Sequence, residues 1–203
     1  MSLLDQITRN GYIAIPDFMS IKQCNEIKLE GLRNKTVRYK PFWMAMPSIF
    51  NELMLGWETG DRMPTADFVE GETVQPAQLT QPYMYRPWTT YTELLSIRLV
   101  LLLTQVNSKS ITLVPNTTKE KYETNRLQSN QYDDMLYDPN AVSFTGMKGT
   151  LLVLHGRTLH SLGTEDYVTE EPRQLMVADF VHPKVEKSVR LYQKVIADQQ
   201  RDS

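Results

Sequence analysis

The sequence predicts a mainly β protein with flanking helices, arranged as a sandwich or a jelly roll. From Pro82 onward, seven candidate strands alternate with spacers rich in Asn, Asp, Gly and Pro. Many short strands in a chain of this size are typical of those two architectures. The length of 203 residues fits one domain with a sizeable core, and helical patterns stand before and after the β-rich part.

The seven expected strands are short apolar runs, each closed by turn residues. They span 83–91, 96–105, 110–114, 141–145, 150–155, 159–162 and 173–181.

Helical signals are clearest near the N-terminus. A short helix over 3–8 is expected to end before Gly11, and a strand over 12–15 follows. The next helix begins after Ser20, because Ser20 and Gln23 have the spacing of a capping box, in which each side chain satisfies the other's backbone N–H.

The chain is expected to form one domain, 1–203, with four parts. Residues 1–35 form a helix, a strand and a helix, and residues 36–80 form a packed insertion with one short helix near 48–55. Residues 81–182 form the β-rich core. The last part, 185–201, is a closing helix with one apolar face.

Composition excludes several classes of partner and site. The formal charge of −2, from 22 basic and 24 acidic residues, gives no reason to expect nucleic acid or a membrane as a partner. The single cysteine, Cys24, excludes an internal disulfide and is expected to be a small buried side chain. The longest apolar run, 99–103, is far too short to span a bilayer, and the first residues do not resemble a signal peptide. A soluble protein of the cytoplasm is therefore expected.

Four segments in the same order resemble the phytanoyl-CoA dioxygenase type of iron(II)/2-oxoglutarate oxygenase. Residues 11–20, Gly-Tyr-Ile-Ala-Ile-Pro-Asp-Phe-Met-Ser, resemble that family's opening strand, loop and capped helix. Residues 99–115 resemble its paired central strands, which end in Val-Pro. Residues 149–163 resemble its strand with the distal metal histidine, and residues 173–180 resemble its cosubstrate-arginine strand. The resemblance implies a double-stranded β-helix, which is a cupin-like jelly roll.

The resemblance implies a role for two residues. His160 matches the distal iron ligand, and Arg173, 13 residues later, matches the arginine that binds the distal carboxylate of 2-oxoglutarate. A planar guanidinium suits a carboxylate because it donates two parallel hydrogen bonds. The alternative for Arg173 is an arginine at a strand entry, either solvated or paired with Glu170 or Glu171.

The first half of the implied iron site is missing from the sequence. Such oxygenases hold iron(II) with two histidines and one carboxylate, and in the family the first two ligands come as His-x-Asp shortly before a central strand. The three histidines here are His155, His160 and His182, so none precedes residue 155. The corresponding stretch, 85–93, offers only the carboxylate of Glu93. His160 is therefore the one metal position retained, and its alternative role is a packed or hydrogen-bonded histidine.

Two further candidate residues lie close to His160 in the sequence, His155 and Arg157. His155 precedes Gly156 at a strand end and is not expected to bind a metal, because affinity requires the right geometry as well as an imidazole. Arg157 lies between the two histidines. The sequence leaves open whether its side chain points into or out of the opening of the expected barrel.

These observations favour a non-catalytic relative of the oxygenases that binds no cofactor and serves as a binding or structural module. It would assemble with itself or with another protein, for example in a viral or other large particle, through the aromatic and Met-rich region 42–57. The alternative is an active iron(II)/2-oxoglutarate-dependent dioxygenase that hydroxylates a small or lipid-like substrate with an atypical metal site. A third hypothesis is a sensor that binds 2-oxoglutarate or another carboxylate through Arg173 without chemistry.

Overall fold

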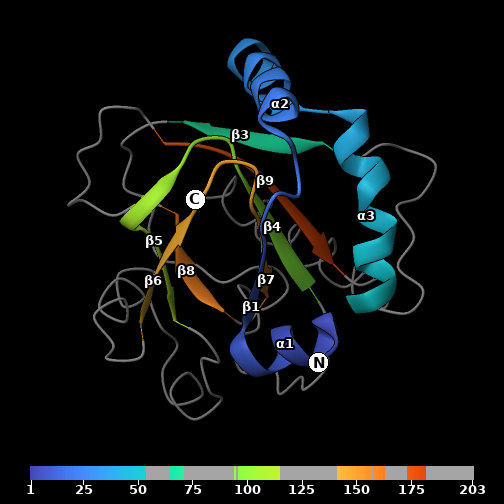
Figure 1. Cartoon of the computed structure of the whole chain (residues 1–203), viewed down its shortest axis with the longest axis vertical. Helices are drawn as coiled ribbons and strands as arrows, with labels where there is room; N and C mark the ends of the chain where they lie inside the picture. Colours follow the sequence, from blue (N-terminus) through green and yellow to red (C-terminus); the bar gives the residue numbers. More distant parts are fainter. Residues whose placement is uncertain are drawn as a thin grey trace, which may run out of the picture.

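Two antiparallel sheets and three helices make up the described part of the chain (Figure 1). The computed structural model describes residues 1–53, 65–70, 94, 96–114, 141–156, 158–162 and 173–181, the side chains of 107–110 excepted. The order of elements is α1 (Leu3–Asn10), β1 (Tyr12–Ile15), α2 (Ile21–Asn34), β2 (Thr36–Val37), α3 (Lys40–Leu53), β3 (Ala66–Glu70), β4 (Ser96–Leu102), β5 (Val106–Val114), β6 (Val142–Gly146), β7 (Leu151–His155), β8 (Leu159–Ser161) and β9 (Gln174–Val181).

The larger sheet has six strands in the order β1-β7-β4-β9-β3-β2, and the smaller sheet has three in the order β6-β5-β8. Every pair is antiparallel. The central strand β4 pairs with β7 on one side and β9 on the other, and Arg98 lies opposite both Leu154 and Asp179. This arrangement confirms the predicted mainly β class with flanking helices.

The N-terminal helices begin and end where local sequence chemistry predicts. Ser2 and Asp5 form a capping box on α1, and Ser20 and Gln23 form the expected one on α2. Gly11 ends α1 in the left-handed region, with φ of 78°, which glycine adopts without steric cost.

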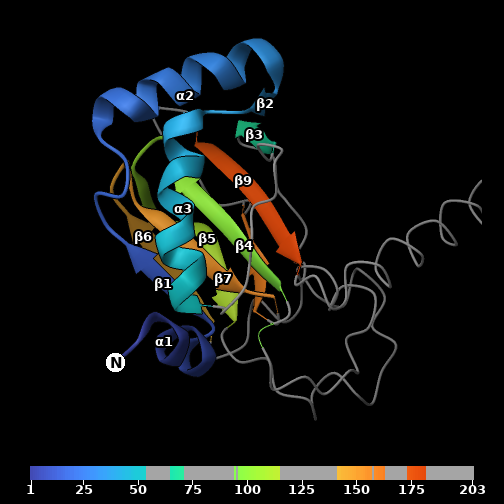
Figure 2. The same cartoon turned by 90° about the vertical axis from the view of Figure 1, so that its right-hand side faces the viewer.

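The three helices cover one face of the larger sheet. Figure 2 shows α3 running along the strands, with α2 across one end of the sheet and α1 at the other. Alternate residues of β4 (Ile97, Leu99, Leu101) point toward these helices and join one apolar cluster with them. Cys24 of α2 is fully buried in this cluster, and burial raises the pKa of its thiol, so the prediction of a small buried side chain is confirmed.

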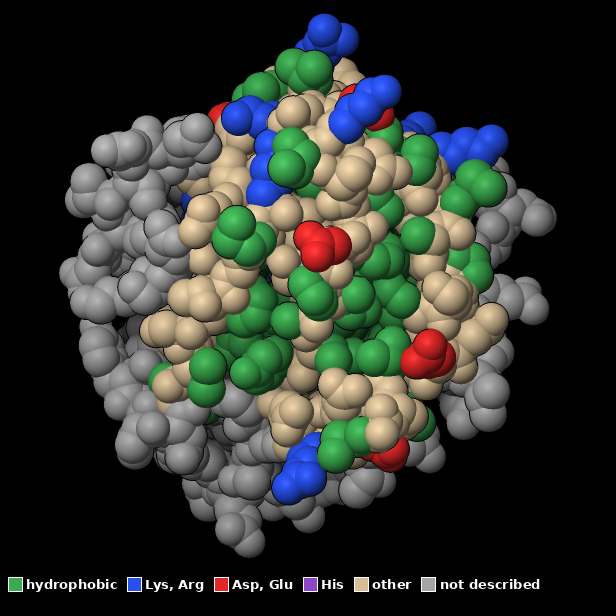
Figure 3. All heavy atoms as spheres, in the orientation of Figure 1, with side chains coloured by type: hydrophobic (Ala, Val, Ile, Leu, Met, Phe, Trp, Pro, Cys, Tyr) green, Lys and Arg blue, Asp and Glu red, His purple; other side chains and the backbone are tan. Residues whose placement is uncertain are grey.

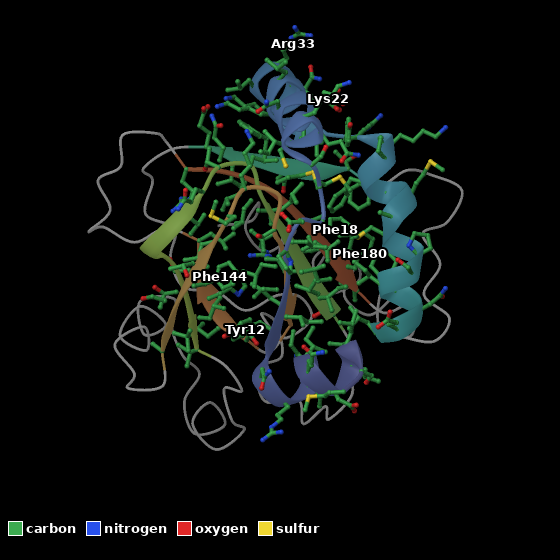
Figure 4. All side chains as sticks on the ribbon, in the orientation of Figure 1. Tyr12, Phe18, Lys22, Arg33, Phe144 and Phe180 are labelled. Carbon is green, nitrogen blue, oxygen red and sulfur yellow. The ribbon has the colours of Figure 1, made fainter. Side chains whose placement is uncertain are left out.

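The other face of the larger sheet packs against the smaller sheet. Val100 and Leu102 of β4 meet side chains such as Ile111 and Leu113 of β5 in a second apolar cluster. Along the side where β1 faces β6, Tyr12 and Phe144 meet edge to face, with ring centroids 6.4 Å apart (Figure 4). The two sheets therefore pack face to face, and the middle of the contact is apolar.

Within the predicted insertion 36–80, the structure describes residues 36–53 and 65–70. They supply β2 and β3, and β3 pairs with β9 as part of the larger sheet. The helix of this segment is α3, which begins eight residues before the expected range of 48–55. Its apolar side chains pack on the sheet, and this tertiary burial stabilises a helix that contains Pro47.

Two predicted elements, the strand over 83–91 and the closing helix over 185–201, lie outside the described residues. Within the described ranges, no helix is both long enough and apolar enough to cross a membrane. On the face drawn in Figure 3, Lys and Arg side chains gather over α2, whereas hydrophobic side chains fill the middle of the face.

Candidate functional site

His160 lies on β8 of the smaller sheet and is fully buried. It pairs with Leu113 of β5, whose side chain belongs to the inner cluster, so the imidazole also faces the larger sheet. Both ring nitrogens have partners. Nδ1 lies 2.9 Å from the carbonyl oxygen of Thr158, and Nε2 lies 2.8 Å from Nη1 of Arg98.

These partners fix the tautomer of His160. A guanidinium only donates hydrogen bonds, so Nε2 must accept from Arg98, and Nδ1 carries the proton that it donates to Thr158. Burial lowers the pKa of His160 to about 3, helped by the nearby charge of Arg98 and opposed by the hydrogen bond to Thr158. The imidazole is therefore neutral at physiological pH.

Arg98 is held in place by Asp179, its cross-strand neighbour on β9. Nε and Nη2 of Arg98 each lie 2.7 Å from one carboxylate oxygen of Asp179, which is the bidentate arrangement that suits a guanidinium. Arg98 is buried, whereas the Asp179 side chain is 33% exposed. A continuous chain of hydrogen bonds thus runs from β9 through β4 to β8.

Iron(II) does not fit this set of side chains. The Nε2 lone pair of His160 and both carboxylate oxygens of Asp179 already accept hydrogen bonds from Arg98. A dication there would also lie against a guanidinium, which is never deprotonated in proteins. Among the described residues, no group of three His, Cys, Asp or Glu side chains is placed to hold a metal ion.

Arg173 directly precedes β9 and is buried. Because side chains alternate along a strand, Arg173 points to the same inner face as Leu175, Val177 and Asp179. The backbone of Arg173 is six residues from that of Asp179, which corresponds to about 20 Å along an extended strand. Arg173 therefore begins at the opposite end of β9 from the His160 cluster, and its contact with 2-oxoglutarate stays a prediction.

His155 is also kept apart from His160. It lies opposite Ile97 at the end of β7, and by alternation it belongs to the helix-covered face with Leu151 and Val153. The sheet thus separates His155 from the inner face that carries Arg98. The remaining candidates of the predicted site, including Glu93 and Arg157, lie outside the described residues.

Sequence reasoning missed Arg98 and Asp179, although a signal was present. Arg98 is the only charge within Ser96–Leu102, and Asp179 is the only charge within Gln174–Val181. A charge inside a buried apolar strand needs a partner. Two such strands with opposite single charges predict a cross-strand ion pair.

Comparison with known proteins identifies the fold. No protein-family model matches the chain, and no curated protein matches it. Among solved structures, apo HygX from Streptomyces hygroscopicus is 16% identical, with a TM-score of 0.58 over 89% of this chain and 85% of that chain. A Pseudomonas putida prolyl-4-hydroxylase is 12% identical, with a TM-score of 0.57 and coverage of 89% and 91%. SnoN, a non-haem alpha-ketoglutarate-dependent epimerase from nogalamycin biosynthesis, is 16% identical, with a TM-score of 0.56 and coverage of 89% and 82%.

HygX has also been solved with nickel and 2-oxoglutarate bound, and with iron bound. Identities this low show the fold alone, and they do not separate the phytanoyl-CoA dioxygenase type from other oxygenases, so that finer resemblance stays a prediction. Together with the two antiparallel sheets and the flanking helices, they show that this chain has the jelly-roll fold of the iron- and 2-oxoglutarate-dependent oxygenases.

Proposed function

We propose that this protein is an oxygenase-fold protein without oxygenase activity, which acts as a binding or assembly module. The observation that carries the proposal is the contact between Arg98 Nη1 and His160 Nε2. This hydrogen bond occupies the Nε2 lone pair, which a metal would need. His160 is also the one histidine that matches a metal position of the resembled family. The fold does not require a metal for its core, because two apolar clusters stabilise its sheets.

Energetics favour the closed arrangement. To free His160 for a metal, the guanidinium of Arg98 would have to leave both His160 and Asp179. Removing one partner from a buried ion pair costs about 3–5 kcal/mol, and partial exposure of Asp179 reduces that figure. Metal binding would have to offset this cost in addition to repulsion by the guanidinium.

The test is metal content together with turnover. Tag-free protein is incubated with iron(II), ascorbate and 2-oxoglutarate, and succinate is quantified alongside bound iron. We expect no bound iron, no succinate and no change in melting temperature, because a ligand that favours the native state would raise it. Iron-dependent succinate formation that is lost in His160→Ala would refute the proposal and establish the active oxygenase with an atypical site.

The region proposed for partner contact is 42–57, of which the structure describes 42–53. Six apolar side chains of α3 are buried within this chain, whereas Met44 is 70% exposed. Contact by the described part of this region therefore depends on Met44 more than on the aromatic residues that suggested it.

Self-association through α3 is tested by sedimentation velocity over a range of protein concentrations. Met44→Glu should abolish association, because it places a charge in the proposed contact. Asn51→Glu adds the same charge at another exposed position of α3 and should leave association unchanged. A monomer at every concentration removes self-association and leaves a different protein as the partner.

A further inference from the structure

We propose that the outer face of α2 is a docking surface for an acidic amphipathic helix of another protein. This outer face comprises Ile21, Lys22, Lys28, Leu29, Leu32 and Arg33. The inference goes beyond the proposed function and does not depend on it, because none of the residues hydrogen-bonded around His160 lies on α2.

Three exposed apolar side chains form a stripe along the outer face. Ile21 is 68% exposed, Leu29 is 54% exposed and Leu32 is 39% exposed. Because successive residues are about 100° apart around a helix, these three fall within about a quarter turn of one another. They lie outside the arc of Cys24 and Ile27, which is buried against the sheet. A helix that only packs on its own sheet needs one apolar face, so the second apolar stripe indicates a contact with another molecule.

Cations lie on both sides of this stripe. Around the helix, Lys22 and Arg33 follow Leu29 on one side, and Lys28 lies on the other side. None of these three cations forms an ion pair within the described part of the chain. Figure 4 shows Lys22 and Arg33 at the outer end of the molecule. A fourth cation, Lys148, comes from the turn between β6 and β7, where its Nζ donates a hydrogen bond to α2.

The two carboxylates of α2 are held by other groups. The hydroxyl of Tyr39 donates to Glu26, and the backbone N–H of Arg38 donates to Glu30. Both acidic side chains therefore bind the segment that follows α2 instead of pairing with the cations of the outer face. The outer face is positive although the chain has a formal charge of −2, and it is complementary to an acidic partner.

A protein helix fits this face better than an anionic membrane does. A membrane presents negative charge over its whole surface, so it would also meet the carboxylates of Glu26 and Glu30. A helix carries its carboxylates at separate positions and can place them opposite the cations alone. Lys22 and Arg33 are 11 residues apart, which corresponds to about 16 Å, or about three turns of a partner helix.

The experiment measures binding of a model ligand to the whole tag-free chain by fluorescence anisotropy. The ligand is a labelled peptide of about 18 residues, which is long enough to be helical, with Leu on one face and Glu on both flanks of that face. Wild type should bind it about tenfold more tightly than the same peptide with Gln in place of every Glu. This difference should shrink at high salt, because exposed charges are screened.

Two pairs of variants locate the binding on α2. Arg33→Glu should weaken binding roughly tenfold, whereas Arg9→Glu makes the same change in the last turn of α1 and should alter it by less than about twofold. Leu29→Gln should weaken binding about fivefold, whereas Leu4→Gln at an exposed position of α1 should not. The controls are suitable because α1 lies at the other end of the sheet (Figure 2).

The inference is overturned if wild type binds the Glu and Gln peptides equally, or if Arg33→Glu and Arg9→Glu weaken binding to the same extent. It is also overturned if the peptide does not bind while vesicles with about 30% phosphatidylserine bind wild type and not Arg33→Glu, because the occupant would then be a membrane. Succinate formation by wild type would refute the proposed function and leave these binding results unchanged, so the two failures are distinguishable.

Discussion

The two faces of the larger sheet use the same strands for different purposes. On β4, Ile97, Leu99 and Leu101 enter an apolar cluster with the helices, whereas Arg98 on the opposite face enters a hydrogen-bonded chain. The helix-covered face is apolar except at strand ends, where His155, Gln174 and Glu70 lie, and the inner face is apolar only in its middle. The comparison teaches that one sheet can serve packing alone on one face and can hold a hydrogen-bonded cluster of polar side chains beside its apolar core on the other.

The largest expected effect is on the helix-covered face. Leu99→Ala should lower the free energy of unfolding by about 2–5 kcal/mol, because it leaves a cavity in a fully buried cluster. Urea unfolding measures this cost. Val100→Ala, the adjacent residue on the inner face, is the matched control and should cost less because fewer atoms are removed. A loss below 1 kcal/mol for Leu99→Ala would contradict the assignment of the main core to this face.

The next effect tests whether Arg98 needs the carboxylate of Asp179 as its counter-charge. Asp179→Leu should destabilise the protein by about 2–4 kcal/mol, since it leaves the buried guanidinium of Arg98 without its counter-charge. Arg98→Met/Asp179→Leu should be more stable than that single variant, because the unpaired charge is gone. Urea unfolding of both proteins decides. A double variant that is less stable than Asp179→Leu would show that Arg98 stabilises the fold without needing Asp179.

A smaller effect is a dependence on pH that comes from His160. Its pKa is lowered from 6.5 to about 3 in the folded protein. Between these values the unfolded chain binds a proton that the folded protein does not, so stability falls as pH falls through this window and is complete above it. The expected loss is about 2 kcal/mol between pH 6.5 and pH 5.

His160→Gln is the comparison for this pH effect, because its amide can still accept from Arg98 but does not titrate. The difference in unfolding free energy between wild type and variant should therefore shrink as pH falls from 6.5 toward 5. A difference that is independent of pH would mean that the imidazole is not buried as a neutral acceptor.

The smallest effect concerns Ser96. Ser96→Ala removes a buried hydroxyl that makes no hydrogen bond within the described chain, so it should change stability by less than about 0.5 kcal/mol, toward stabilisation. Thermal unfolding measures it. Destabilisation by more than 1 kcal/mol would show that Ser96 has a partner on the inner face.

Most strands were predictable because their apolar runs are closed by turn residues. The predicted ranges 96–105, 141–145, 150–155 and 173–181 overlap β4, β6, β7 and β9. β3 was missed although Ala66 and Phe68 are buried and Asp67 between them is exposed, which is the alternation of a strand. The frequent Pro and Gly residues of the surrounding segment indicated loops instead of a strand. The pairing of β3 with β9 is a tertiary contact, which local sequence patterns do not predict.

The candidate site was only partly predictable for the same reason. The sequence indicated His160 as a candidate residue. The partner of its Nε2 is Arg98, which lies 62 residues away in the sequence and on the other sheet. The sequence did indicate that an N-terminal His-x-Asp is absent. It could not show that an arginine occupies the vicinity of His160, because that depends on register between strands and sheets.

The pairing of β1 has a consequence for how the chain folds during synthesis. Tyr12 pairs with Leu154, and the Gly11 carbonyl accepts from His155 N and Thr158 Oγ1, so these contacts join residues roughly 140 positions apart. At about 5–20 residues per second, a ribosome needs roughly 7–30 s to make that stretch. The strand β1 therefore cannot pair with β7 until most of the chain has been translated. Contacts of such long sequence separation are also typical of slow refolding.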